Sequence, residues 1–341
     1  MEVLIAIVFT LIAGSINGSY ALPTKKLTAW RFENTWMVFA IYTFLITPWL
    51  FLLIVAPNAW QVYQHASGHL LRILLVGGFV FGIGQIGFAF ALERIGMGLA
   101  FVINISLSVV LGSLLPFFLL HQHHDFHIGS ILNFIGIAVI IFGVLSSYFA
   151  GKRREQVASK DDDNSVRYII GVLAAVLAGL GSAGQNFSFA ATASMQTMGL
   201  QLGLSKLASS FIIWPGFLTA AFIPYALYML VLNVKNKSFS VYQTGERKYY
   251  LYAVYMAVCW FGSLVFYSKA SQLIGRLGPV IAWPLFMSLI ILTSNFWGWR
   301  FGEWLNMDAR SKTLMKRGIA LFLISVVLFA AAAAYTNHVR L

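Results

Sequence analysis

Charged side chains are scarce in this sequence. Only 10% of its 341 residues are Asp, Glu, Lys or Arg, whereas 59% are hydrophobic and the mean hydropathy is +0.79. A soluble domain of this composition could not cover its apolar surface with polar groups, so a soluble globular fold is excluded. Cysteine is almost absent as well. The single Cys259 excludes an internal disulfide and a metal site built from several thiolates.

The hydrophobic residues fall into ten stretches that are long enough to cross a membrane. The hydrocarbon core is roughly 30 Å thick, and a helix of about 20 residues spans it. Because no water satisfies the backbone there, each stretch is predicted to be helical. Glu2 is acidic and no A-x-A cleavage site precedes Pro23, so we expect the first span not to be a cleaved signal peptide. The predicted spans are Val3–Tyr20, Trp36–Val55, Leu70–Ala91, Leu99–Leu120, Gly129–Ala150, Tyr168–Ala190, Leu207–Val231, Tyr249–Ser268, Gly278–Trp297 and Gly318–Tyr335.

One longer polar segment, residues 151–167, divides the chain almost in half. It contains Lys152–Arg154 and Asp161–Asp163, which are typical of a solvated linker. We therefore predict a first five-helix repeat at residues 1–150, a cytoplasmic linker at 151–167 and a second five-helix repeat at 168–341. An odd number of spans makes the second half enter the membrane from the opposite side. The predicted fold class is an all-α integral membrane protein with ten transmembrane helices in a 5+5 inverted repeat.

Weak internal similarity accompanies this division. Ile95-Gly96 and Ile274-Gly275 each lie at a predicted tight turn between two spans. A Gly-Ser pair followed by Asn recurs at Gly14–Asn17 and Gly181–Asn186. Membrane helices share a common composition, so this similarity supports the repeat only faintly.

Lys and Arg are distributed unevenly between the loops. The odd-numbered loops hold 18 of them, and the even-numbered loops and the C-terminal tail hold five. Because cytoplasmic loops carry an excess of Lys and Arg, we predict a multi-pass protein of the cell inner membrane with both termini extracytoplasmic. The net charge of +12 is therefore a topology signal. Because the basic residues are spread over separate loops, we do not expect nucleic acid as a partner. Membrane lipid is expected to surround the protein.

Two short sequence motifs could indicate a cofactor site or a metal site. Gly82–Gly87 fits the G-x-G-x-x-G fingerprint, but it lies inside an apolar span with no preceding strand. His121–His127 holds four histidines and Asp125 and could bind zinc or nickel. We favour a solvated external loop, because a short loop hardly supplies the further groups that orient metal ligands. No cofactor and no metal are therefore predicted, and no nucleophile–base pair nearby points to catalysis.

Neutral polar and aromatic side chains recur within the predicted spans. A polar group in the hydrocarbon needs a partner, so it usually faces the bundle interior or a cavity. Amides donate and accept hydrogen bonds at once and aromatic faces cover C–H surfaces, which suits an uncharged, hydroxyl-rich solute. The alternative is that the amides hold helices together and the tryptophans mark the membrane interface. The candidate substrate-binding residues are Asn17, Tyr20, Gln85, Asn104, Gln185, Asn186, Trp260, Tyr267 and Trp283.

Two carboxylates near the span ends are candidates for proton coupling. Glu33 opens the second helix, where the helix dipole stabilises a carboxylate. Glu93 lies at the end of the third helix beside Arg94, which could hold it charged. Ion pairing with a structural role is the alternative for both. No carboxylate lies deep within a span.

Short motifs in a fixed order along almost the whole chain point to a known family. They are Tyr20–Lys26 followed by Trp30 and Glu33; Pro48-Trp49; Gly82–Gln85 with Arg94, Gly96 and Met97; Gly112 and Pro116; Ser182–Phe187; and Glu303-Trp304. In order and spacing they resemble the L-rhamnose–proton symporter family of the drug/metabolite transporter superfamily. The resemblance implies ten helices in a 5+5 inverted repeat, a central pathway and secondary transport of a sugar coupled to protons.

We therefore expect a secondary active transporter that moves a small neutral polar solute, a sugar such as rhamnose, across the inner membrane with protons. A drug or metabolite exporter of the same superfamily is the close alternative, because aromatic-rich walls also suit lipophilic cargo. A membrane-embedded enzyme would require a catalytic pair at membrane depth, and the sequence offers none. A non-transporting scaffold would be expected to have larger extramembrane surfaces than these short loops.

Overall fold

The computed structural model describes residues 1–120, 127–156, 165–244, 246–302, 305 and 307–338. Within these ranges the side chains of 92–93, 96–98, 152–156, 165, 244 and 337–338 are not described. The described residues form helices and no strand. Ten of the helical segments are long and apolar enough to cross a membrane. The chain is thus a multi-pass, all-helical membrane protein, as the hydrophobic stretches predict.

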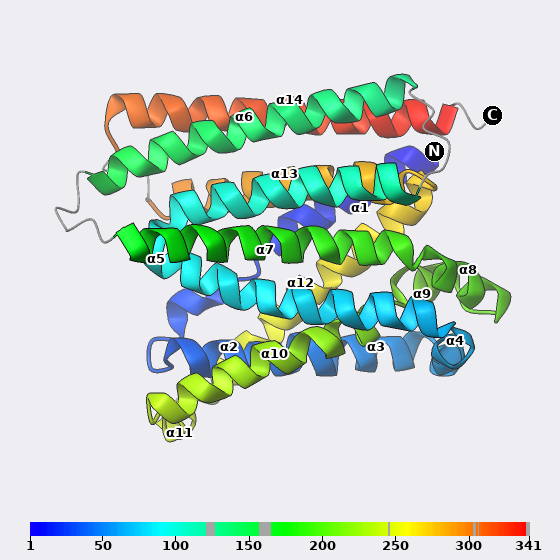
Figure 1. Cartoon of the computed structure of the whole chain (residues 1–341), viewed down its shortest axis with the longest axis horizontal. Coiled ribbons are helices and arrows are strands. Elements are labelled where there is room, and N and C mark those ends of the chain that lie inside the picture. The colour runs from blue at the N-terminus through cyan, green and yellow to red at the C-terminus, as the bar shows by residue number, and fades with distance from the viewer. Residues whose placement is uncertain (121–126, 157–164, 245, 303–304, 306, 339–341) are drawn as a thin grey trace.

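The helices lie roughly side by side along one direction (Figure 1). In chain order they are α1 (Glu2–Asn17), η1 (Leu22–Lys26), α2 (Phe32–Ala40), η2 (Ile41–Ile46), α3 (Thr47–Val55), η3 (Pro57–Ala59), α4 (Trp60–His65), α5 (Gly68–Leu120), α6 (Ile128–Gln156), α7 (Ser165–Ala191), α8 (Ala193–Gln201), α9 (Lys206–Phe211), α10 (Trp214–Lys235), α11 (Val241–Thr244), α12 (Arg247–Ile274), α13 (Gly278–Arg300) and α14 (Ala309–His338).

Helix α5 contains two membrane spans, Gly68–Ala91 and Leu99–Leu120. A straight helix of 53 residues would be about 80 Å long, far more than the bilayer thickness. A Cβ atom on Gly84 would lie 3.1 Å from Gly181 Cα, and one on Gly179 would lie 2.7 Å from Leu107 Cβ. Parts of α5 that are 23 residues apart therefore reach the same turn of α7. The chain reverses between them, and the second arm runs back past α7 (Figure 1).

The eighth span is longer than predicted. The sequence interpretation ended this span at Ser268 and placed Ile274-Gly275 at the turn to the ninth span, and α12 continues to Ile274. Gly275 then ends the helix with φ of +87°, a conformation that glycine adopts without a steric penalty. Six further residues, several of them polar, are thus held on a rigid helix at one end of the bundle.

Prolines mark the helix starts and one irregular turn. Pro279 occupies the first turn of α13, which confirms the prediction that it begins the ninth span. The π-helical turn η2 lies just before Pro48, whose missing N–H leaves a preceding carbonyl without its usual donor. This turn carries Phe44, which packs against Phe81 and Trp260 in the interior.

Helix packing follows a regular order along the two halves. Helix α1 packs against α12 and α13, and α7 packs against both arms of α5. Helices α6 and α14, the last spans of the two halves, pack against each other along one edge of the bundle (Figure 1). Exchanging each span for the one five places later leaves this contact pattern unchanged, as an inverted repeat requires.

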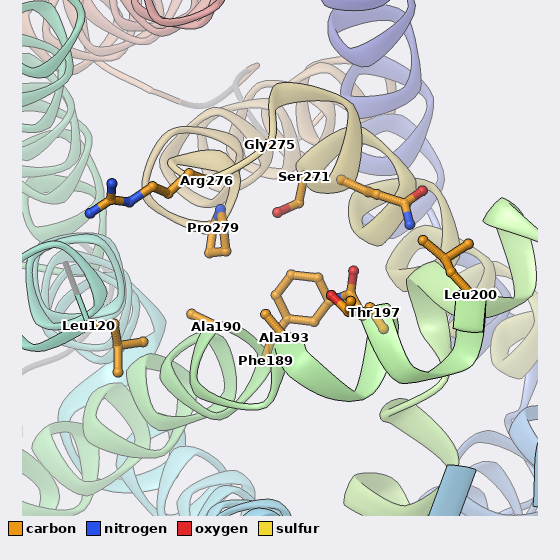
Figure 2. Close-up of a pocket in the computed structure, with 12 residues that line it drawn as sticks. Leu120, Phe189, Ala190, Ala193, Thr197, Leu200, Ser271, Gly275, Arg276 and Pro279 are labelled. Atoms are coloured by element: carbon orange, nitrogen blue, oxygen red, sulfur yellow. The ribbon is translucent and has the colours of Figure 1, made fainter. Parts of the chain in front are cut away.

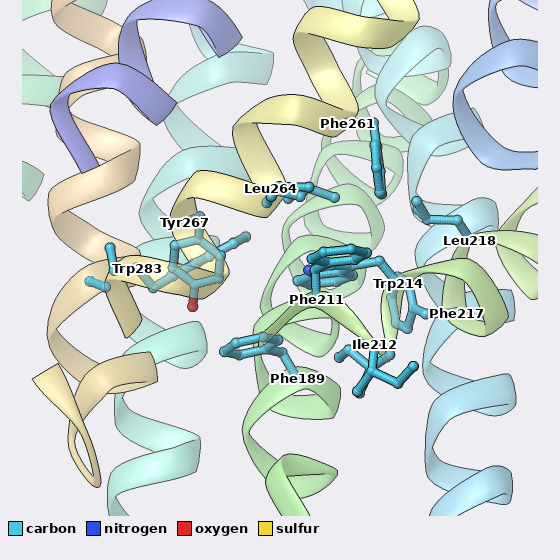
Figure 3. Packing of buried hydrophobic residues seen from close by; sticks show 14 of the residues in the cluster. Phe189, Phe211, Ile212, Trp214, Phe217, Leu218, Phe261, Leu264, Tyr267 and Trp283 are labelled. Atoms are coloured by element: carbon cyan, nitrogen blue, oxygen red, sulfur yellow. The ribbon is translucent and has the colours of Figure 1, made fainter. Parts of the chain in front are cut away.

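Part of the buried core consists of four aromatic rings in contact. Trp214 stacks on Phe189 with ring centres 5.3 Å apart and planes 7° apart, and the Tyr267 ring centre also lies 5.3 Å from that of Phe189. Tyr267 also meets Trp283 at 5.4 Å in an edge-to-face geometry. These four rings come from α7, α10, α12 and α13 and are almost fully buried (Figure 3). These rings adjoin the polar residues of the bundle interior.

Candidate functional site

A pocket of about 380 Å³ lies at the end of the bundle where α12 turns into α13. The end of α7, helix α8 and the last residue of α5 close its other sides (Figure 2). Its wall combines amides, hydroxyls, one guanidinium and apolar groups. The lining residues are Leu120, Phe189, Ala190, Ala193, Gln196, Thr197, Leu200, Ser271, Gln272, Gly275, Arg276 and Pro279.

The pocket adjoins the buried amide of Asn186. Its Nδ2 donates hydrogen bonds to the carbonyls of Pro279 at 2.9 Å and Gly112 at 2.7 Å, and its Oδ1 accepts one from the Tyr267 hydroxyl. Asn186 thereby connects α7 to α5, α12 and α13. Since Phe189 and Pro279 line the pocket, the Asn186–Tyr267 pair lies directly behind the pocket wall. Both the nitrogen and the oxygen of the Asn186 amide are therefore hydrogen-bonded within the protein in this conformation.

Trp283 completes this buried layer. Its indole Nε1 donates to the carbonyl of Ser108 at 3.0 Å. A Cβ atom on Gly112 would lie 2.6 Å from that nitrogen, so only glycine allows α5 and the indole to approach so closely. We call Asn186, Tyr267 and Trp283 the central layer.

Asn17 is attached to the same helix as Tyr267. Its Nδ2 donates to Ser263 Oγ at 2.7 Å, and Ser263 lies one turn before Tyr267 on α12. Ser263 in turn donates to the carbonyl of Trp260 at 2.6 Å. The matching asparagines of the first and sixth spans therefore both bond to α12, one turn apart.

A second aromatic group lies around Trp260, two turns before Tyr267 on α12. Trp260 contacts Phe44 and Phe81 at 5.7 and 6.4 Å between ring centres, and Tyr225 contacts Phe44 at 5.8 Å. Gln85 is one turn from Phe81 on α5, is half-buried and makes no hydrogen bond within the described protein. Tyr20 stacks on Phe39 at 5.6 Å.

Asn104 and Gln185 lie along the contact between α5 and α7. Asn104 Oδ1 accepts a hydrogen bond from Ser182 at 3.4 Å, a long contact. Gln185 is 4% exposed, and its Nε2 has no partner among the described residues. None of the nine predicted substrate residues lines the pocket itself. Asn186, Tyr267 and Trp283 lie together behind it, and the others are spread along the bundle interior.

Glu33 lies at the opposite end of the bundle from the pocket, where α2 begins. It is 3% exposed and is the only buried acidic side chain among the described residues. Its Oε1 accepts hydrogen bonds from Ser238 Oγ at 2.7 Å and Asn236 Nδ2 at 3.0 Å. The contacts join α2 to the end of α10, and Asn34 extends them through Nδ2 to Asn233 Oδ1 at 3.1 Å.

Tyr242 borders this polar cluster. Burial raises the pKa of its hydroxyl, while hydrogen bonds with Asn34 and Asn233 act in the opposite direction. The ring of Tyr242 meets Trp30, which also contacts Tyr249 at 5.5 Å and so closes this end of the bundle with aromatic side chains. We call Glu33 and its partners Asn34, Asn233, Asn236 and Ser238 the Glu33 cluster.

Two predicted features lie outside the described residues. The side chain of Glu93 is not described, and residues 121–126 of the histidine-rich loop are not described. His127 Nδ1 accepts a hydrogen bond from the Ser130 amide at 3.1 Å. Among the described residues, no group of three or more His, Cys, Asp or Glu could hold a metal ion.

Sequence reasoning missed the residues that form the pocket wall. The predicted eighth span ended at Ser268 and so did not include Ser271 and Gln272, and the pairing of Lys269 Nζ with Gln272 Oε1 at 2.6 Å had no signal in the sequence. Trp214, whose Nε1 donates to Ser268 Oγ at 2.6 Å, is also absent from the predicted substrate residues. The signal available in the sequence for this pocket wall was a row of polar residues at the end of an apolar span.

The family model and the curated relatives point to one family. The family model described as L-rhamnose-proton symport protein (RhaT) matches residues 1–335. A protein named L-rhamnose-proton symporter from Shigella dysenteriae serotype 1 (strain Sd197) is 24% identical over 328 residues, covering 92% of this chain and 94% of the relative. One of the same name from Yersinia pestis (strain Pestoides F) is 24% identical over 343 residues, covering 97% and 96%. A solved crystal structure covers 95% of this chain and 96% of its own, with a TM-score of 0.53 and 16% identity, which shows a shared fold.

Proposed function

Because the chain belongs to the L-rhamnose-proton symport protein family, we propose that it is a secondary active transporter that carries a small neutral sugar such as L-rhamnose across the inner membrane together with protons. Relatives over nearly the whole chain are named symporters, which supports a transporter rather than an enzyme. The match over residues 1–335 leaves little of the chain for another activity.

The pocket at the α12–α13 turn is the observation that best supports this function. Its volume of about 380 Å³ lies in the range of small-molecule sites, about 300–1,000 Å³. Its hydroxyls and amides can bond to sugar hydroxyls, and Phe189 offers a ring to a C–H face. We infer that solute enters here and reaches the central layer of Asn186, Tyr267 and Trp283.

The opposite end of the bundle supports an alternating mechanism. There the Glu33 cluster and the ring contacts of Trp30 pack closely, whereas the other end carries the pocket. Transport then requires the central layer to open toward the Glu33 end, where Trp260, Gln85 and Tyr20 would line the path. We propose that the two five-helix units, residues 1–150 and 168–341, move against each other around this layer.

The predicted topology indicates which side of the membrane each end of the bundle faces. The pocket end carries the even-numbered loops and the N-terminus, which are poor in Lys and Arg. The Glu33 end carries the odd-numbered loops, which are rich in them. We therefore propose that the pocket faces the extracytoplasmic side and the Glu33 cluster faces the cytoplasm.

Glu33 is the group that we propose for proton coupling. It is buried, it accepts hydrogen bonds from neutral donors, and the charge of Arg31 acts on it electrostatically without a direct ion pair within the described protein. Protonation would exchange an acceptor for a donor and so disturb the contacts that join α2 to α10. The group that senses protons would thus also hold the cytoplasmic end closed.

Ligand-dependent thermal stability of the purified protein tests the assignment. A solute that binds the folded form raises its apparent stability in proportion to the logarithm of its concentration above Kd. We expect L-rhamnose or a related neutral sugar to raise the melting temperature, and amino acids and nucleosides to leave it unchanged. Stabilisation by lipophilic cations, with no response to sugars, would instead assign the chain to the exporters.

A further inference from the structure

Lys269 and Gln272 form a pair at the pocket wall. Lys269 lies in the last turns of α12 and is half-buried, and its Nζ contacts Gln272 Oε1 at 2.6 Å. Gln272 lines the pocket, whereas Lys269 does not. Because the helix continues to Ile274 and ends at Gly275, both side chains project from a rigid element rather than from a loop.

The chemistry of the pair fixes the orientation of the Gln272 amide. An ammonium group only donates hydrogen bonds, whereas an amide has one acceptor oxygen and one donor nitrogen. Lys269 Nζ therefore donates its hydrogen bond to Oε1 of Gln272, and Nε2 of Gln272 takes no part in this pairing. Nε2 makes no hydrogen bond within the described protein and is not enclosed by it. Because Gln272 lines the pocket, its two N–H groups are available to a molecule bound there.

We propose that Lys269 is a positioning residue for sugar recognition, acting through Gln272. It holds the Gln272 amide with its N–H groups toward the pocket, where they donate to a ring or hydroxyl oxygen of the solute. Ser271 and Arg276 place further donor groups on the same wall. The solute would bind with its acceptor oxygens toward α12 and a C–H face toward Phe189. This inference rests on the proposed sugar transport.

The charged neighbours of Lys269 provide a matched control. Lys206 and Glu2 are close enough to interact with it electrostatically. Lys206 is exposed and outside the pocket lining, and its side chain makes no contact with the Gln272 amide. Lys206→Met therefore removes the same charge from the same end of the bundle without releasing the amide.

A double-mutant cycle tests the proposal. Lys269→Met, Gln272→Met and the double variant are measured for L-rhamnose binding by calorimetry and for uptake in vesicles. Loss of one oriented hydrogen bond should raise Kd and KM about five- to tenfold with the maximal rate unchanged. The double variant should be no worse than Gln272→Met, and Lys269→Arg should restore most of the affinity. Gln272→Glu, which keeps the pairing with Lys269 but loses the N–H groups, should bind as poorly as Gln272→Met.

The outcomes separate the two proposals. Wild-type binding of L-rhamnose with equal affinities in all variants would overturn the role of Lys269 and leave sugar transport standing. A Lys269→Met effect that persists in the Gln272→Met background, or that Lys206→Met reproduces, would assign Lys269 to general stability or charge and overturn the proposal. Absence of L-rhamnose binding by the wild-type protein would overturn the proposed sugar and this inference together.

Discussion

Replacing Asn186 by leucine should lower the free energy of unfolding by an amount that follows from its hydrogen bonds. The change removes three hydrogen bonds between helices, to Gly112, Pro279 and Tyr267, while keeping a similar side-chain volume. Side-chain hydrogen bonds between membrane helices contribute about 0.6 kcal/mol on average and at most about 1.7 kcal/mol. Three average bonds give about 2 kcal/mol, so Asn186→Leu should lower the free energy of unfolding by about that amount.

Two comparison variants make this estimate specific. Tyr267→Phe removes one of the three bonds and should cost about 0.6 kcal/mol. Asn295→Leu is the matched control, because Asn295 Nδ2 bonds only to the carbonyl of Ile291 in its own helix. It should leave the free energy of unfolding within about 0.5 kcal/mol of the wild-type value.

Denaturant-induced unfolding in mixed micelles measures all three variants. The expected order of stability is wild type, then Asn295→Leu close to it, then Tyr267→Phe, then Asn186→Leu. Asn186→Leu should also lose sugar uptake, because the layer behind the pocket wall is broken. An Asn186→Leu protein as stable as Asn295→Leu would refute the reasoning that this amide joins four helices.

Three further predictions test other parts of the account. Glu33→Gln keeps a hydrogen-bonding side chain but cannot ionise; sugar exchange across vesicles should persist while accumulation driven by a proton gradient is lost. Gly112→Ala would push a methyl group against the indole behind it and should cost about 1–3 kcal/mol, whereas Gly184→Ala, which enters open space, should not, as thermal melts can show. Single cysteines in a cysteine-free background should react with an impermeant thiol reagent from outside at Asn337 and not at Ser159; the opposite labelling would reverse the proposed topology.

Apolar runs made the membrane spans predictable. All ten spans were found from the sequence, because a stretch such as Gly129–Ala150 has few options other than a buried or lipid-facing helix. The reversal of α5 was also anticipated, since two spans separated by a short Gly-containing segment must turn there. The eighth span was predicted to end at Ser268, six residues before α12 ends, whereas the turn at Ile274-Gly275 was predicted correctly.

The site was harder to predict for a physical reason. The sequence identified Asn186 and Tyr267 as polar groups at membrane depth, and the structure brings them together. Their other partners include the main-chain carbonyls of Gly112 and Pro279, and any residue can provide a carbonyl. The pocket wall depends on where α12 ends and how Lys269 orients an amide, which are properties of three-dimensional packing.

Proton movement during sugar uptake is the most direct test of the central claim. Purified protein is reconstituted into vesicles that contain a pH-sensitive dye, and L-rhamnose is added outside with no imposed gradient. The account predicts that the vesicle interior acidifies as sugar enters, that an uncoupler abolishes the pH change, and that Glu33→Gln vesicles do not acidify. Sugar entry with no acidification in the wild-type protein would contradict proton-coupled transport.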